Sequence, residues 1–187
     1  MQRELVERAR AGDHEAFSVL VRASYPRLHD VARLILRDQE RAQDAVQEAL
    51  ERAWRHVRAL RDPDAWDAWL RRLTVHACYR WASKVKRREE VELHVAPDLE
   101  PAHPSDFSTL VAERDRMGRA LGRLSLDLRT VVVLHFYLDL PLTEVADVLG
   151  VPVGTVKSRL NRALQALRTA MAAERPIPFR DARERSA

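Results

Sequence analysis

The sequence predicts an all-α protein made of two small helical domains, which are joined by an acidic, proline-containing linker. The second domain carries a helix-turn-helix. Apolar residues recur every three or four positions along most of the 187 residues, which is the period of an amphipathic helix. No segment alternates apolar and polar residues as a half-buried strand does. Residues 89–109 contain three prolines and lack a helical period, so they divide the helical segments into two groups.

The first predicted domain covers residues 1–88. Gly12 and Asp13 form a start signal for its first strongly periodic helix. Pro63 suits the first turn of a long helix whose apolar face begins at Trp66. Before that long helix, the periodic segments are 13–24, 26–37 and 40–60.

The second predicted domain covers residues 110–173 and has the spacing of a helix-turn-helix. Thr143 is a candidate cap of a short helix, Gly150 supplies a left-handed turn, and Pro152 suits the start of the next helix. The tail, residues 174–187, is charged and interrupted by prolines, and we expect it to be disordered. The predicted helices of this domain are 110–122, 126–138, 142–149 and 153–173.

Charge is distributed unevenly along the chain. The net charge is only +4 because 28 acids accompany 32 cations, so the position of each charge matters more than the total. Residues 71–88 hold seven cations and residues 153–170 hold four, and neither block contains an acid. Between them, residues 89–115 hold eight acids and one cation. Either basic block alone could be a solvated helix face, but two of them on separate helices indicate two contacts with a polyanion.

The last predicted helix has two faces of opposite character. Its apolar face consists of Val156, Leu160, Ala163, Leu164 and Leu167. Its other face is polar, basic and free of acids, and consists of Lys157, Ser158, Asn161, Arg162, Gln165 and Arg168. Because this face begins at the helix N-terminus, it fits a recognition helix that enters the major groove of DNA. The alternative is a solvated bundle helix, but such helices usually pair Glu with Lys, and this one contains no Glu.

Three segments carry a family resemblance. They are DAVQEALERAWRH (44–56), WDAWLRRLTVHACYRWASKVKRR (66–88) and SLDLRTVVVLHFYLDLPLTEVADVLGVPVGTVKSRLNRAL (125–164). In this order they resemble the polymerase-binding helix, the promoter −10 helix and the −35-binding domain of the bacterial sigma-70 family, in its extracytoplasmic-function (ECF) subgroup. The resemblance implies a dissociable subunit that gives core RNA polymerase its promoter sequence and helps to open the DNA.

The resemblance also implies partners and contact residues. Besides promoter DNA, the implied partner is core RNA polymerase, through its β′ clamp helices and its β flap, and an anti-sigma factor is a further candidate. The residues implied to face the clamp helices are Asp44, Gln47 and Glu48. The residues implied to read or hold the −35 element are Lys157, Ser158, Asn161 and Arg162. The acidic linker would suit the basic walls of polymerase channels, and a plain tether is the alternative.

The predicted −10 helix departs from the family pattern. It has His76 where the family commonly carries Asn, and Arg80 where the family commonly carries Asp or Asn. These residues are four apart and share one helix face, so we expect Arg80 to grip backbone phosphate while His76 lies nearer the bases. The alternative is a partly buried His76 that a neighbour satisfies. Lys84 and Arg87 complete the predicted −10 contacts, and the loop 60–65 corresponds to the family's pocket for a flipped-out base.

Aromatic residues in or beside the first basic block allow two interpretations. Trp66 and Trp69 share the apolar face of the long helix and are predicted to be core residues. Tyr79 and Trp81 lie nearer the basic end, where stacking on unpaired bases and packing in the core are equally supported.

The sequence contains no pattern of catalytic chemistry. There is no metal-ligand spacing, no nucleotide-binding loop and no recognisable nucleophile with its base, so we expect no catalytic residue, metal or cofactor and no enzyme activity. The single cysteine, Cys78, is predicted to be a packed thiol in a reducing compartment. A charged N-terminus and the lack of a long apolar run predict a cytoplasmic protein without membrane insertion.

Two other functions stay open at this point. One is a helix-turn-helix transcription regulator that acts without joining core polymerase, although residues 1–90 show no ligand-binding or phosphoacceptor domain. The other is an all-helical adaptor, which the acid-free face of the last helix argues against.

Overall fold

The structure is a computed structural model that describes residues 1–91 and 109–173, and the side chains of residues 1–85 and 116–173. Within these ranges it contains eight α-helices and no strand, which confirms the all-α prediction. Most of the predicted linker and all of the predicted tail lie outside the described residues. The α-helices are α1 (Gln2–Arg10), α2 (His14–Leu36), α3 (Gln39–His56), α4 (Trp66–Val91), α5 (Thr109–Gly122), α6 (Leu126–Val132), α7 (Leu142–Leu149) and α8 (Val153–Ala173). Shorter turns are the 3₁₀ elements η1 (Val57–Ala59) and η2 (Pro63–Ala65) and the π-helical turn η3 (Val133–Tyr137).

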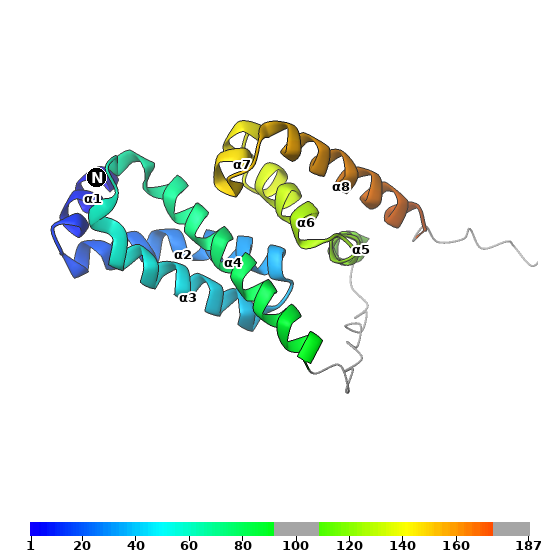
Figure 1. Ribbon diagram of the computed structural model, residues 1–187, viewed down its shortest axis with the longest axis horizontal. Helices are drawn as coiled ribbons and strands as arrows, with labels where there is room; N and C mark the ends of the chain where they lie inside the picture. The colour runs from blue at the N-terminus through cyan, green and yellow to red at the C-terminus, as the bar shows by residue number, and fades with distance from the viewer. Residues whose placement is uncertain (92–108, 174–187) are drawn as a thin grey trace, which may run out of the picture.

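Helices α1 to α4 form the first group, in which α3 packs against both α2 and α4 (Figure 1). Asp13 begins α2 as predicted, because its carboxylate accepts hydrogen bonds from two backbone N–H groups of the first turn at 2.9 and 3.0 Å. Trp66, Ile35 and Leu70 are the largest fully buried side chains of this group, so the apolar stripes of α2 and α4 meet in its core.

Helix α2 is one continuous helix that contains most of both periodic segments, 13–24 and 26–37, which are separate in the sequence pattern. Pro26 lies inside it. A proline removes one backbone hydrogen bond, the one that the carbonyl of Arg22 would accept. Both residues are exposed, so water can satisfy that carbonyl and the helix continues across the proline.

The connection between α3 and α4 is more finely divided than predicted. α3 ends at His56 and not at residue 60, and η1 follows it. Pro63 opens the turn η2 ahead of α4, and the carboxylate of Asp62 accepts a hydrogen bond from the backbone N–H of Asp64 at 3.0 Å. α4 then continues to Val91, three residues into the segment predicted as the linker.

Helices α5 to α8 form the second group, and α7 and α8 make the predicted helix-turn-helix. Gly150 ends α7 in the left-handed region, at φ +66° and ψ +35°, as its position in the turn requires. Thr143 is not the cap of α7, because the helix already begins at Leu142 and Pro141 takes the cap position without a side-chain hydrogen bond.

The left-handed conformation of Gly150 predicts that its replacement by alanine lowers the free energy of unfolding. A Cβ at this position would meet nothing within 4 Å, so Gly150→Ala should cost only the left-handed strain, about 1 kcal/mol in the free energy of unfolding. Gly154→Ala is the matched control, since its Cβ is also unobstructed but its backbone is helical. Urea unfolding of both variants should show a loss for residue 150 and no loss for residue 154, and equal losses would contradict the role of the turn.

The two groups of helices pack against each other. α7 lies against α4, and both α6 and η3 lie against α2. Tyr137 donates a hydrogen bond to Asp30 at 3.0 Å, and Arg71 lies 3.9 Å from Glu144. The buried apolar residues of both groups form one contiguous core. The predicted −10 helix α4 therefore contacts the helix-turn-helix directly.

Candidate nucleic-acid interface

The predicted recognition face of α8 is exposed to solvent. Its four predicted contact residues are Lys157, Ser158, Asn161 and Arg162, and all are exposed. The opposite face packs inward through Val156, Leu160, Ala163, Leu167 and Ala170. Among the described residues, the polar contacts of these four side chains lie within the helix: the Ser158 hydroxyl donates to the carbonyl of Thr155 at 2.9 Å, and Arg162 Nε donates to the carbonyl of Ser158 at 3.4 Å. The four side chains are therefore free to meet DNA.

One cation of this basic block has a structural role. Arg159 Nη2 lies 2.8 Å from Asp127 Oδ2, and the Arg159 side chain is only 20% exposed. This ion pair ties α8 to the first turn of α6. The acid-free stretch along the sequence therefore overstates the cations that α8 presents to a polyanion.

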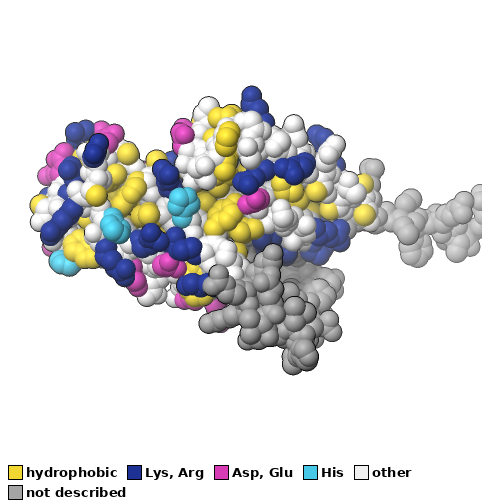
Figure 2. Space-filling model, viewed as in Figure 1, with side chains coloured by type: hydrophobic (Ala, Val, Ile, Leu, Met, Phe, Trp, Pro, Cys, Tyr) yellow, Lys and Arg dark blue, Asp and Glu magenta, His cyan; other side chains and the backbone are white. Residues whose placement is uncertain are grey.

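Lys and Arg side chains are spread over both groups of helices on the face shown in Figure 2, with Asp and Glu side chains among them. On α4, Lys84 is exposed and its ammonium lies 4.8 Å from the centre of the Trp81 ring. Arg80 is less exposed, and its Nε donates a hydrogen bond to Glu48 Oε1 at 2.8 Å. The side chain of Arg87 lies outside the described residues.

His76 is half-buried beside α7, as in the alternative in which a neighbour satisfies it. Burial lowers the pKa of His76, and the nearby cations Arg72, Arg80 and Arg52 lower it further. A hydrogen bond to the backbone of Val148 acts in the opposite direction and is the weaker influence. The imidazole is therefore held neutral at neutral pH.

The lowered pKa of His76 makes stability depend on pH. Its folded pKa lies below its ordinary value of about 6.5, so the unfolded chain binds the proton more tightly. The neutral His76 imidazole therefore contributes to the free energy of unfolding, fully above about pH 6.5. This contribution is lost as the pH falls toward the pKa of the folded state. Between pH 7.5 and 5.5, the urea midpoint should fall more for the wild-type chain than for His76→Gln. Equal falls would show that His76 does not titrate in this way.

The aromatic residues of α4 divide as follows. Trp66 is fully buried and Trp69 is half-buried against the core, which confirms their interpretation as core residues. The Tyr79 hydroxyl donates a hydrogen bond to Asp127 Oδ1 at 2.8 Å, and burial raises the pKa of Tyr79. Trp81 is half-buried and also packs against the core. Tyr79 is therefore hydrogen-bonded to α6, in the second group of helices.

The predicted polymerase face of α3 covers three directions around the helix. Asp44 is exposed on the outer side. Gln47 is exposed toward α2 and its amide donates to Glu51 Oε1 at 3.4 Å. Glu48 is half-buried toward α4, where it meets Arg80. The structure therefore brings together Asp44 and Gln47 on the surface and places Glu48 in the seam between two helices.

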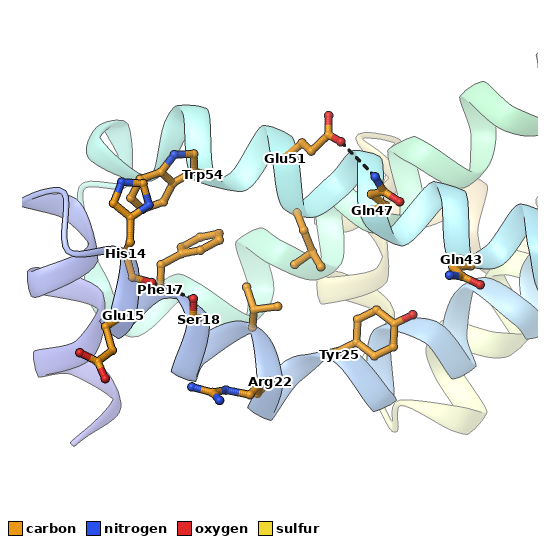
Figure 3. Close-up of a pocket in the computed structure, with 12 residues that line it drawn as sticks. His14, Glu15, Phe17, Ser18, Arg22, Tyr25, Gln43, Gln47, Glu51 and Trp54 are labelled. Atoms are coloured by element: carbon orange, nitrogen blue, oxygen red, sulfur yellow. Dashed lines mark hydrogen bonds between the residues drawn. The ribbon is translucent and has the colours of Figure 1, made fainter.

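A groove between α2 and α3, not predicted from the sequence, begins beside Gln47 and has a volume of about 1020 Å³ (Figure 3). Its apolar lining includes Phe17, Leu50 and Trp54, and the ring of His14 lies 4.1 Å from that of Trp54. Periodicity alone shows that each helix has an apolar stripe, and it does not show which part of two stripes stays uncovered. The groove extends the surface on which Gln47 lies.

The geometry of the described residues also bears on metal sites, membrane-spanning helices and a reactive cysteine. In the part of the chain that the structure describes, no group of three or more His, Cys, Asp or Glu could hold a metal ion. Within residues 1–91 and 109–173, every helix is too short or too polar to cross a lipid bilayer. Cys78 is fully buried, and burial raises its pKa to about 12, which makes it an unreactive packed thiol as predicted.

An exposed, basic, acid-free face on a helix-turn-helix is typical of DNA-binding proteins. Comparisons with known proteins identify which class of DNA-binding protein this is. Residues 20–88 match the family model of Sigma-70 region 2, and residues 114–167 match that of Sigma-70, region 4. The chain is 36% identical over 161 residues to ECF RNA polymerase sigma factor SigM of Mycobacterium tuberculosis, covering 86% of this chain and 79% of that protein. It is 32% identical over 175 residues to the ECF RNA polymerase sigma-E factor of Haemophilus influenzae, covering 87% of this chain and 91% of that protein.

Solved structures show the same fold. CnrH, solved in complex with the cytosolic domain of CnrY, is 26% identical and matches with a TM-score of 0.68 over 93% of this chain and 99% of that chain. The sigma factor RpoE of Bartonella quintana, solved with the anti-sigma factor NepR, shares the fold with a TM-score of 0.70 at 24% identity, over 85% of this chain and 98% of that one. The chain belongs to the ECF subgroup of the sigma-70 family. It is a sigma factor, a transcription initiation factor that acts with RNA polymerase.

Proposed function

We propose that this sigma factor holds the −35 element with α8 and the −10 element with α4, and that it joins core RNA polymerase through the outer side of α3. The observation that carries the proposal is the exposed face of α8. On it, Lys157, Asn161 and Arg162 are exposed and form no ion pair or hydrogen bond with an acid among the described residues. Arginine and asparagine are the side chains that read guanine and adenine with two hydrogen bonds. The match to Sigma-70, region 4 covers all of these positions.

The polymerase face is supported by surface chemistry. Asp44 and Gln47 are exposed polar residues, and the groove beside Gln47 offers an apolar floor. A polar rim around an apolar floor is the usual composition of a protein interface. We assign this surface to the β′ clamp helices and the second group of helices to the β flap.

The −10 assignment requires a change of arrangement. His76 and Tyr79 are engaged by residues of the second group of helices, Val148 and Asp127. Contact between these side chains and a DNA strand therefore requires that the two groups separate. Binding to a surface as large as core polymerase can supply the free energy for such a shift, if the polymerase binds the separated form more tightly.

An anti-sigma factor is the further partner that we propose. The support is the likeness of this chain to CnrH, which was solved with the cytosolic domain of CnrY, and the fold that it shares with the sigma factor RpoE, which was solved with the anti-sigma factor NepR. Such a partner would compete with polymerase for the same chain. The cytoplasm is the compartment in which these proposed partners would be met.

The test of the proposed function is run-off transcription with core RNA polymerase on a library of randomised promoters. We expect transcripts only when both core and this chain are present, with sequence enrichment in two separate elements. Sequence-specific DNA binding without core, together with no assembly with core, would instead support a regulator that acts alone.

A further inference from the structure

The seam between α3 and α4 places the two predicted surfaces beside each other. Glu48, implied by the family resemblance to contact polymerase, accepts a hydrogen bond from Arg80, predicted to hold −10 DNA, at 2.8 Å. The two side chains are 29% and 33% exposed, so both partners of this ion pair are partly shielded from solvent. It joins positions that are 32 residues apart in the sequence.

The ion pair belongs to a regular antiparallel arrangement. One turn further along α3, Arg52 lies close enough to affect the pKa of His76, which is one turn back along α4 from Arg80. Along this seam the acid Glu48 of α3 faces Arg80, whereas one turn further along α3 the residue near α4 is the cation Arg52.

Glu48 pairs with Arg80 at a place where three arginines lie close to His76. Arg80 lies near His76, whose pKa is also lowered by Arg72 and Arg52. Without the Glu48 carboxylate, repulsion from these cations would favour rotamers that carry the Arg80 guanidinium away from the seam. Glu48 engages Nε, while Nη2 is buried without a hydrogen-bond partner among the described residues. A buried donor of this kind is costly, and a phosphate oxygen can accept from it only once the seam has opened enough to expose Nη2.

We propose that Glu48 is a positioning residue for Arg80 in promoter opening, and not a contact residue for polymerase. This inference rests on the proposed function of α4. Glu48 holds the guanidinium in one orientation, so that Arg80 meets the DNA strand without first losing rotamer freedom. Asp44 and Gln47 then remain as the polymerase contacts of α3.

The experiment separates assembly from opening. Core affinity is measured by fluorescence anisotropy of the labelled chain, and opening by permanganate reactivity of unpaired thymines at saturating core. Glu48→Gln keeps the shape of the side chain and removes its charge. It should leave core affinity within about twofold and reduce opening about fivefold, and the double variant Glu48→Gln with Arg80→Ala should open no less than Arg80→Ala alone. Glu48→Asp, which keeps the charge, should retain more opening than Glu48→Gln.

The matched control is Asp44→Asn, an isosteric loss of charge one turn away on the same helix. It should weaken assembly and leave opening normal once core is saturating. The inference is overturned if Glu48→Gln behaves like Asp44→Asn, or if the losses in Glu48→Gln and Arg80→Ala add in the double variant. Failure of the wild-type chain to open any promoter with core would instead overturn the proposed function.

A second variant keeps the test decisive if Glu48→Gln unfolds at the assay temperature. Exchanging the charges, with Glu48→Arg and Arg80→Glu, retains an ion pair across the seam. This chain should fold and assemble with core but should not open promoters, because an acid would face the phosphates. Normal opening by the exchanged pair would overturn the inference, since Arg80 would then not be the group that is positioned.

Discussion

A chain that carries Asp44→Lys together with Gln47→Lys should lose assembly with core RNA polymerase while its fold stays intact. Both side chains are exposed, so their replacement removes no packing. If the acidic side of α3 meets a basic surface of the clamp helices, two introduced lysines place like charges at the interface. We expect core affinity to fall more than tenfold, which corresponds to about 1.4 kcal/mol or more.

The choice of positions follows from the structure. A reversal of Glu48 would place a cation beside Arg80, Arg52 and His76, and would therefore disturb the α3–α4 seam as well as any interface. Glu4→Lys on α1 is the matched control, because Glu4 is exposed and lies on a different helix. Assembly is measured by anisotropy with purified core, and the fold by thermal unfolding. Normal core affinity in the folded double variant would mean that polymerase binds another surface.

The exposed polar face of α8 could be predicted from the sequence because one helix with a known period fixes which residues share a side. Lys157 and Arg162 are exposed, and Val156 and Leu160 are buried, as that period requires. Arg159 shows the limit of this reasoning. It lies between the two faces, and only the position of Asp127, 32 residues earlier, determines that it forms an ion pair.

Contacts between helices could not be predicted in the same way. Tyr79 meets Asp127 across 48 residues, and Arg80 meets Glu48 across 32. Periodicity identifies an apolar stripe on each helix but does not give the register in which two stripes pack, because several crossing geometries satisfy the same pattern. From the sequence alone, stacking on bases and packing in the core were equally supported for Tyr79. Glu48 was expected to be a surface residue that contacts polymerase. The fusion of the periodic segments 13–24 and 26–37 into α2 could not be predicted for a related reason, since solvation of one carbonyl is a property of the folded surface.

Loss of the cations of α8 should weaken promoter binding by the polymerase assembly. Arg162 and Lys157 are exposed on the acid-free face, and neither forms an ion pair with an acid among the described residues. If Arg162 makes a two-hydrogen-bond contact to a guanine, Arg162→Ala should cost about 1–3 kcal/mol and relax the preference at one −35 position. If Lys157 contacts only phosphate, Lys157→Ala should weaken all sequences alike and reduce the slope of log affinity against log salt by about one.

The measurement is binding of the assembled polymerase to a set of −35 variants at several salt concentrations, with Thr169→Ala as a control. Thr169 is also exposed on α8, but it lies about two turns beyond Arg162, and its hydroxyl donates to the carbonyl of Gln165 at 3.1 Å. Distance along the helix thus separates a general effect of altering α8 from an effect of the face that meets DNA. A relaxed preference in Arg162→Ala alone would identify the base-reading residue, whereas a reduced salt slope in both variants would make both of them phosphate contacts. Unchanged affinity, preference and salt slope in both variants would remove α8 from the −35 interface, because a face that contributes neither charge nor hydrogen bonds to binding does not touch the DNA.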